Sequence, residues 1–324
     1  MGEFELIRRH FLRNGPPQPP QVVLGIGDDC ALLQPTPGHQ LAISCDMLVQ
    51  GRHFFADVDP AALGHKALAV NLSDLAAMGA RPLGFALALA LPQADNAWLS
   101  AFAQGLFALA DAHACPLVGG DTTRGPLNIC ITVFGELRPG QALRRGAAQP
   151  GDDLYLSGRT GEARLALELI QGTGWARQHA LPGALPRLRE RLERPAPRLA
   201  LGQALAGLAH AALDLSDGLA GDLGHILQAS GVGADIHPAL LPVAPDLQAL
   251  PEAQRLDCLL NGGDDYELLF TAAPAQRAAV AAAAQASQTP VQRIGQISAT
   301  QGLRLLNAAG EPVALTPRGF DHFA

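Results

Sequence analysis

The sequence predicts an α/β protein of two domains. Three observations favour this fold class. The chain has 324 residues, enough for one large or two ordinary domains. Both halves mix short apolar runs typical of strands with longer helical patterns. A segment rich in Gly, Pro and Arg over residues 140–153 separates the halves. We therefore expect one domain at residues 1–140 and a second at 141–324.

The N-terminal half alternates strand and helix patterns. An amphipathic helix over residues 3–12 is followed by a Gly/Pro linker at 14–20. Apolar residues at helical spacing predict a long helix over 60–78 that stops at Gly79 and carries Asp74. A second helix is predicted over 95–114. The predicted strands are 22–24, 41–45, 84–91, 117–118 and 127–136.

The C-terminal half also alternates strand and helix patterns. Its predicted strands are 154–156, 267–271 and a final pair, and its predicted helices are 162–171, 199–210, one ending near 230 and an Ala-rich one after 271. Each half also contains one Leu-Ser-Asp and one Gly-Gly-Asp. These two three-residue motifs either reflect a duplication that produced the two halves or recur by coincidence.

Composition narrows the function classes. The formal charge is -7, with 22 Arg, a single Lys (Lys66) and no basic block, which speaks against nucleic-acid binding. Five Cys form no CxxC pair, which argues against a disulfide framework or a zinc site and fits a reducing cytoplasm. The longest apolar run is far below the roughly 20 residues that span a bilayer. We expect small-molecule partners, with no nucleic acid and no membrane.

Apolar runs end in Asp at six places. The first is Gly25-Ile26-Gly27-Asp28-Asp29-Cys30, which taken alone reads equally well as a polar hairpin turn or as the edge of a metal–phosphate site. The others end at Asp46, Asp74, Asp121, Asp217 and Asp264-Asp265, the Asp217 run also containing Asp214. If these carboxylates converge, each close pair repels by roughly 4 kcal/mol at an effective dielectric of 20. A converging set therefore predicts bound cations.

Several phosphate-handling motifs are absent. The lone Lys66 is not part of a Walker loop or of the lysine–glutamate pair of eukaryotic-type kinases, and no Gly-x-Ser-x-Gly occurs. Phosphate would then be held by Asp-bound cations, backbone amides and Arg, such as Arg124 or the Arg144-Arg145 pair. The alternative for that pair is a solvated linker charge. His53 either orients a phosphate or caps a strand, and Phe320 is either a packed aromatic or a ligand-stacking one.

Six motifs then occur in one order along the chain. They are GIGDDCA (25–31), DMLV with HF (46–54), NLSDLAAMGA (71–80), GGDTTRG (119–125), DLSDG (214–218) and GGDDYEL (262–268), closed by GFDHF (319–323). In this order they resemble the bacterial thiamine-monophosphate kinase family, end to end. The wider superfamily includes aminoimidazole ribonucleotide synthetase, selenophosphate synthetase and a hydrogenase-maturation protein.

This resemblance implies a two-domain fold with mixed sheets flanked by helices, an N-terminal sheet that pairs in a homodimer, and a C-terminal domain that closes over the nucleotide. It implies ATP-dependent phosphorylation of thiamine phosphate to thiamine diphosphate, the last step of thiamine diphosphate biosynthesis. The transfer would be direct, in line and assisted by several Mg²⁺ ions. Asp29, Asp121 and Arg145 would be the catalytic residues.

The resemblance also implies the ligand sets. The implied Mg²⁺ ligands are Asp29, Ser44, Cys45, Asp46, Asp74, Asp121, Asp214 and Asp217. The implied ATP contacts are Gly120, Asp121, Arg145 and Ser216, and the implied thiamine phosphate contacts are His53, Asp264 and Phe320. Two positions depart from the usual pattern: Cys45 replaces Thr or Ser, which puts a side-chain ligand there in doubt, and Asp264 replaces a longer Glu.

Two other readings compete with a thiamine-phosphate kinase. Another enzyme of the superfamily would cyclise a formylglycinamidine substrate and ignore thiamine phosphate. A metal- and nucleotide-binding regulatory module would bind ATP without forming product from any phosphorylated acceptor. The full set of Asp motifs favours the enzyme over the regulatory module.

Overall fold

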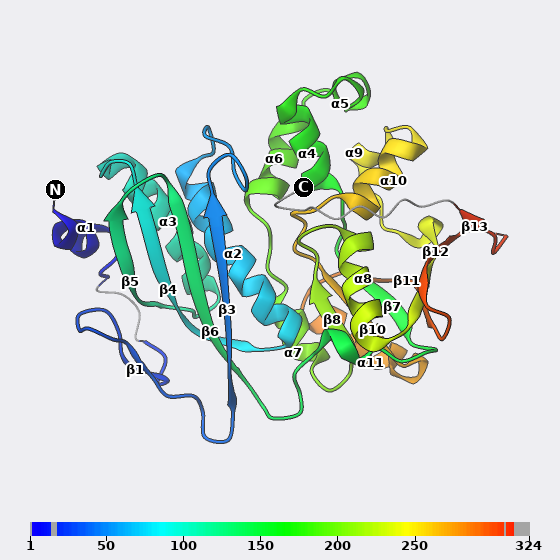
Figure 1. Ribbon diagram of the computed structural model, residues 1–324, viewed down its shortest axis with the longest axis horizontal. Coiled ribbons are helices and arrows are strands. Elements are labelled where there is room, and N and C mark those ends of the chain that lie inside the picture. Colours follow the sequence, from blue (N-terminus) through cyan, green and yellow to red (C-terminus); the bar gives the residue numbers. More distant parts are fainter. Residues whose placement is uncertain (1, 14–17, 308, 314–324) are drawn as a thin grey trace. The chain divides into compact units, whose positions relative to one another are not determined.

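The computed structural model describes residues 2–13, 18–307 and 309–313. Within these limits the chain forms two compact units (Figure 1), Met1–Leu75 with Ala80–Gly140 and Ala76–Gly79 with Gln141–Ala324. We call them unit 1 and unit 2 and describe each by itself. Among the described helices, none combines the length and the apolar character needed to cross a membrane.

Unit 1 contains a four-stranded sheet, a small two-stranded sheet and three helices. Its elements are α1 (Glu3–His10), β1 (Val22–Leu24), β2 (Leu32–Leu33), β3 (Gln40–Val49), α2 (Pro60–Met78), β4 (Arg81–Leu91), α3 (Asn96–Ala112), β5 (Leu117–Arg124) and β6 (Asn128–Leu137). The strand order in the larger sheet is β3-β6-β4-β5, so β3 and β5 are its edges. Only the β4–β5 pair of this sheet is parallel.

One face of this sheet is covered by helices and the other is open. Alternate residues of β4 and β6, such as Phe85, Leu87 and Ile131, are buried on the face toward α2 and α3. The two helices touch backbone to backbone, because a Cβ on Gly64 would lie 2.1 Å from the Phe102 carbonyl oxygen. The open face exposes apolar side chains of β3, which are Leu41, Ile43 and Met47.

Unit 2 is built on a seven-stranded sheet of order β13-β12-β9-β11-β7-β10-β8. Its strands are β7 (Asp153–Ser157), β8 (Ala211–Asp214), β9 (Gly233–Ile236), β10 (Leu268–Ala272), β11 (Val291–Ser298), β12 (Gly302–Leu306) and β13 (Pro312–Val313). The three strands β7, β10 and β8 are buried along their whole length, which explains their mainly apolar sequences. Tyr155 and Phe270 stack between neighbouring strands with ring centroids 5.1 Å apart.

Helices flank this sheet as well. They are η1 (Arg145–Ala147), α4 (Glu162–Gln171), α5 (Gly174–His179), α6 (Leu185–Glu193), α7 (Leu199–Leu205), α8 (Leu219–Ser230), η2 (Pro238–Leu240), α9 (Pro245–Gln248), α10 (Glu252–Asn261), η3 (Pro274–Gln276) and α11 (Arg277–Ala286). The predicted α/β class with mixed sheets flanked by helices is therefore confirmed.

Several predicted elements need correction. The helix predicted over 199–210 ends at Leu205, and the chain turns before β8 begins at Ala211. The strand predicted at 117–118 continues to Arg124, because Gly120 adopts a φ of 143° and β5 stays paired with β4 throughout. The strand predicted at 41–45 extends from Gln40 to Val49 along β6.

Candidate active site

In unit 1, β3 and α2 bring together one group of predicted metal ligands. Ser44 and Asp46 alternate on β3 and so share its helix-side face. The Ser44 Oγ donates to Asp74 Oδ2 at 2.5 Å, and the Asp46 backbone N–H donates to Asn71 Oδ1 at 3.0 Å. Asn71 and Asp74 lie three residues apart on α2, hence on one side of the helix. The group offers hard oxygen donors at a half-buried position.

Cys45 points to the opposite face of the sheet. Its Sγ lies 3.4 Å from Cys130 Sγ and accepts from Thr132 Oγ1 at 3.4 Å. Burial raises the pKa of the Cys130 thiol to about 11, and its hydrogen bond with Cys45 acts in the same direction. The structure thus separates the Cys45 side chain from Ser44 and Asp46, with which the sequence analysis had grouped it.

Asp29 lies in an exposed turn between β1 and β2. These two strands pair antiparallel, and Gly27 in the turn has a φ of 133°. The Asp29 backbone N–H donates to Asp28 Oδ1 at 2.9 Å, and both Asp side chains are exposed. Locally this is the polar hairpin that the sequence allowed, and it presents its carboxylates to solvent.

Asp121 lies on β5 next to Gly120, and only glycine fits at position 120. A Cβ there would sit 1.9 Å from the Leu87 carbonyl oxygen. The register places Asp121 beside Ala88, which pairs with Cys130, which in turn pairs with Met47. Because residues paired across a sheet share a face, Asp121 belongs to the open face.

Asp46 and Asp121 are therefore separated in two ways within one chain. Asp46 is on edge strand β3 and Asp121 on edge strand β5, with β6 and β4 between them. Three inter-strand spacings of about 4.8 Å amount to about 14 Å. The two carboxylates also belong to opposite faces by register. A single chain does not bring them to one ion.

His53 follows β3 in a turn that it stabilises. Its Nδ1 accepts the Val49 backbone N–H at 3.0 Å, so a neutral ring carries its proton on Nε2. The His53 carbonyl oxygen accepts from Lys66 Nζ at 3.2 Å. The capping role foreseen for His53 is present, whatever else its ring contacts.

In unit 2 the two motifs Asp214–Asp217 and Gly262–Asp265 lie side by side. The Leu215 N–H donates to the Glu267 carbonyl at 2.9 Å, and the Tyr266 N–H donates to the Leu215 carbonyl at 2.8 Å. The Asp264 N–H donates to the Ser216 carbonyl at 2.9 Å. This ladder continues the β8–β10 pairing beyond the strands and brings Asp264 next to Ser216.

Arg145 and Asp222 complete this part of unit 2. The Arg145 carbonyl oxygen accepts from Ser230 Oγ at 2.8 Å, which ties η1 to α8. Asp222 Oδ2 accepts the backbone N–H groups of Asp217 and Gly218 at 3.0 and 3.1 Å. Burial raises the pKa of Asp222 to about 6, and the positive charge of Arg145 acts in the opposite direction. The structure thus places Arg145, Asp217 and Asp264 in one unit.

Some contributing residues escaped the sequence analysis. Asp222 accepts the backbone N–H groups of the turn at Asp217. Its position in the first turn of α8 is the feature of the sequence that could have identified it. Glu267 and Arg198, which anchor the neighbouring loop, gave no signal because they are 69 residues apart. Phe320 falls outside the described residues. Among the residues that the structure covers, no group of three or more His, Cys, Asp or Glu side chains is arranged to hold a metal ion.

The chain is similar to proteins of known family along its whole length. Models of the AIR synthase related protein family match residues 27–137 for the N-terminal domain and 149–306 for the C-terminal domain. The thiamine-monophosphate kinase of Escherichia coli strain K12 is 48% identical over 325 residues, which cover 100% of this chain and 98% of that protein.

Solved structures agree with this. A thiamine-monophosphate kinase from Stenotrophomonas maltophilia K279a is 48% identical with a TM-score of 0.83, covering 91% of this chain and 93% of the other. The structure described as AaThiL complexed with AMPPCP and TMP is 28% identical with a TM-score of 0.76, covering 89% of both chains. The chain therefore belongs to the thiamine-monophosphate kinase family, built from the N- and C-terminal AIR synthase related domains.

Proposed function

We propose that this protein transfers the γ-phosphoryl group of ATP to thiamine phosphate and so forms thiamine diphosphate. The observation that carries the proposal is the 48% identity, over the full chain, to proteins named as thiamine-monophosphate kinases. A relative with 28% identity was solved with AMPPCP and TMP, ligands that stand for a nucleotide and an acceptor. The five cysteines of this chain, which form no CxxC pair, support a cytoplasmic location.

The acidic side chains fit Mg²⁺ in their chemistry. Ser44, Asp46 and Asp74 in unit 1 offer only oxygen donors, as do Asp214 and Asp217 in unit 2, and Mg²⁺ prefers carboxylates, waters and phosphates. With Asp29 and Asp121 these residues would hold the ions. When bound, Mg²⁺ supplies the positive charge that lets two polyanions approach.

The remaining roles fall to groups of the chain itself. The attacking phosphate oxygen is ionised near neutral pH, since a second phosphate pKa is near 6, so no strong general base is needed. Arg145 would pair with nucleotide phosphate, and Gly120 and Ser216 would contact it through main chain and hydroxyl. His53, Asp264 and Phe320 would face the acceptor. Positioning and charge then account for a direct in-line transfer without a covalent enzyme intermediate.

A homodimer would complete this site. Because Asp46 and Asp121 occupy opposite edges of one sheet, they can serve one phosphate-metal cluster only if they come from different chains. A second copy laid against the open face would bring the partner's β5 edge to this chain's β3 edge. The site would then contain Asp46 of one subunit and Asp121 of its partner.

The open face supports the same assembly. Ile43 and Met47 on β3 are 59% and 52% exposed, although large apolar side chains on a sheet face are normally covered. Two such faces packed together would bury these side chains in a continuous apolar layer. The proposed dimer therefore covers the apolar open face and brings the β3 edge of one subunit to the β5 edge of its partner, with Asp46 and Asp121 meeting at that shared edge and not between the packed faces.

The direct test is an activity assay. Purified protein is mixed with thiamine phosphate, ATP and Mg²⁺, and thiamine diphosphate is measured by chromatography. The proposal expects product that depends on all three additions. ATP binding without product from this acceptor would contradict it, and would favour a regulatory module or a relative with another substrate.

A further inference from the structure

The loop from Gly262 to Glu267 has a strained conformation. Asp264 and Tyr266 have φ values of 66° and 49°, in the left-handed region that side chains other than glycine avoid. Two such residues flanking a single position cost free energy, and they persist only where the surroundings fix them. Asp265 is the residue between them.

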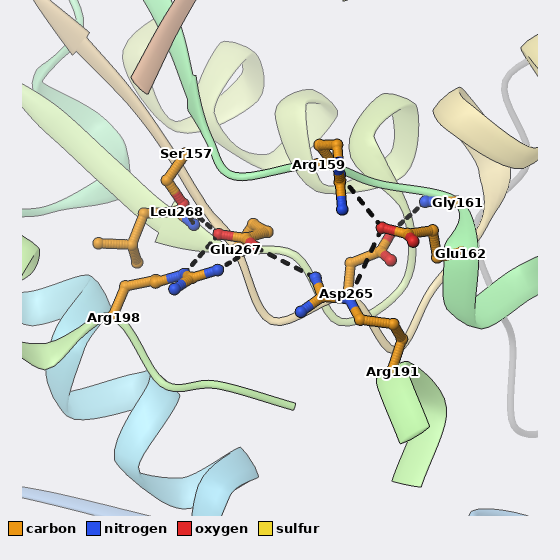
Figure 2. Close-up of polar contacts among 9 residues, drawn as sticks. All are labelled: Ser157, Arg159, Gly161, Glu162, Arg191, Arg198, Asp265, Glu267 and Leu268. Carbon is orange, nitrogen blue, oxygen red and sulfur yellow. Dashed lines mark hydrogen bonds and ion pairs between the residues drawn. The ribbon is translucent and has the colours of Figure 1, made fainter. Parts of the chain in front are cut away.

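The loop is anchored on its C-terminal side by Glu267, as Figure 2 shows. The Glu267 side chain is 1% exposed and accepts from Ser157 Oγ at 2.6 Å. Arg198 donates to it through Nε at 2.7 Å and Nη2 at 2.5 Å. These contacts fix the start of β10 but reach none of the strained residues.

Asp265 anchors the strained part itself. Its side chain is buried, and Oδ2 accepts the Gly161 backbone N–H at 2.8 Å, at the first turn of α4 (Figure 2). Gly161 packs closely against α10, because a Cβ there would lie 2.9 Å from the Cys258 backbone. Burial raises the pKa of Asp265 well above its usual range, which favours the uncharged acid. An amide of the same shape could take its place.

We propose that Asp265 is a positioning residue for the acceptor substrate. The backbone N–H groups of Asp264 and Tyr266 bond to Ser216 and Leu215, and the contact of Asp265 with the Gly161 N–H fixes the residue between them. Together these bonds hold the two left-handed conformations, and Asp265 so sets the direction in which Asp264 meets thiamine phosphate. Asp265 touches neither substrate. This inference rests on the proposed function, because it takes Asp264 as an acceptor contact.

The test compares two substitutions with a control. Asp265→Asn keeps a carbonyl oxygen for the Gly161 N–H, whereas Asp265→Leu has the same branching at Cγ and no acceptor. Asp153→Leu is the control, because Asp153 is also buried and hydrogen-bonded, to Arg277 and Arg293, at the other end of β7. The KM for thiamine phosphate, the KM for ATP and kcat are measured for each variant, together with amide hydrogen exchange across residues 262–267.

We expect Asp265→Leu to raise the KM for thiamine phosphate about tenfold, the effect of losing one buried hydrogen bond, with the KM for ATP unchanged. Exchange at the loop amides should become faster in the same variant. Asp265→Asn should keep both KM values close to those of the unmodified protein. Asp153→Leu should lose stability without changing either KM.

Two results would overturn the inference. One is a tenfold rise in the acceptor KM for Asp265→Asn, which would mean that the charge itself is needed; this variant decides the matter alone if Asp265→Leu does not fold. The other is an Asp265→Leu protein with unchanged acceptor KM and unchanged exchange. Failure of the proposed function would look different from failure of this inference. In that case the unmodified protein and Asp153→Leu would also form no thiamine diphosphate.

Discussion

Asp46 and Asp121 stand on the two edge strands of one four-stranded sheet, with the whole width of the sheet between them. By register they also face opposite sides, Asp46 toward α2 and Asp121 toward the open face. Within one chain this relationship keeps the two carboxylates apart, and the proposed site therefore takes Asp46 from one subunit and Asp121 from its partner.

Removing the charge of Asp121 should abolish turnover and leave the fold intact. The Asp121 side chain is exposed and makes no hydrogen bond or ion pair with any residue that the structure describes, so Asp121→Asn should not change the melting temperature. Loss of one charged group that acts in the transition state typically lowers kcat about 10²–10³-fold. Asp111→Asn, at an exposed Asp paired with Arg13, is the control and should keep full activity. Near-normal turnover of Asp121→Asn at ordinary Mg²⁺ would contradict the assigned role.

Gly120 should tolerate no side chain, in contrast to its neighbour. Gly120→Ala places a Cβ 1.9 Å from the Leu87 carbonyl oxygen at a φ of 143°, so β5 must shift. We expect a loss of roughly 1–3 kcal/mol in the free energy of unfolding, measured by urea titration. Gly119→Ala is the matched control, because a Cβ there meets nothing within 4 Å. Equal stability of the two variants would show that the described path of β5 is wrong.

The open face of the unit 1 sheet should govern oligomeric state. Ile43→Asp puts a charge on this face, and we expect it to shift the protein from dimer to monomer in light scattering and to lower activity. Val23→Asp is the control: Val23 is 58% exposed, much like Ile43, but lies on β1 and outside that face. A dimeric Ile43→Asp protein would contradict the proposed interface.

Asp153 should contribute to acid sensitivity. Hydrogen bonds from Arg277, opposed by burial and aided by Arg293, lower the pKa of Asp153 below its usual range. A lowered folded-state pKa gives stability that is present above the unfolded value near 3.9 and is lost as the pH falls through the folded value. Asp153→Asn should therefore reduce the free energy of unfolding by about 1–3 kcal/mol at pH 7. The difference from the unmodified protein should shrink below about pH 4, as measured by urea titration across this range.

Local patterns predicted many of the elements. The helix predicted over 60–78 was found as α2, and that over 162–171 as α4, because apolar spacing and a following glycine define both. The segment between α4 and α7 was described only as rich in Arg and Pro, yet it forms α5 and α6. Their stability comes from packing in the unit, with Leu188 and Leu192 buried, which spacing in so short a helix does not reveal.

The site was predictable as a set of residues and less so as an arrangement. The motifs identified Asp46, Asp74 and Asp121, and the structure confirms that Asp74 lies on a helix. The sequence could not tell that Cys45 faces away from Ser44, because that depends on which face α2 covers. Nor could it place β3 and β5 at opposite edges, since strand order is set by long-range pairing.

Subunit complementation tests the composite site most directly. Asp46→Asn and Asp121→Asn proteins are each expected to be inactive, and the two are mixed under conditions that allow subunits to exchange. Random exchange makes half of the dimers mixed, and each mixed dimer regains one intact site of two, so activity should return to about a quarter of that of the unmodified protein. If both carboxylates acted within one chain, every site in the mixture would carry a substitution. Absence of any recovery, with exchange confirmed, would contradict the account.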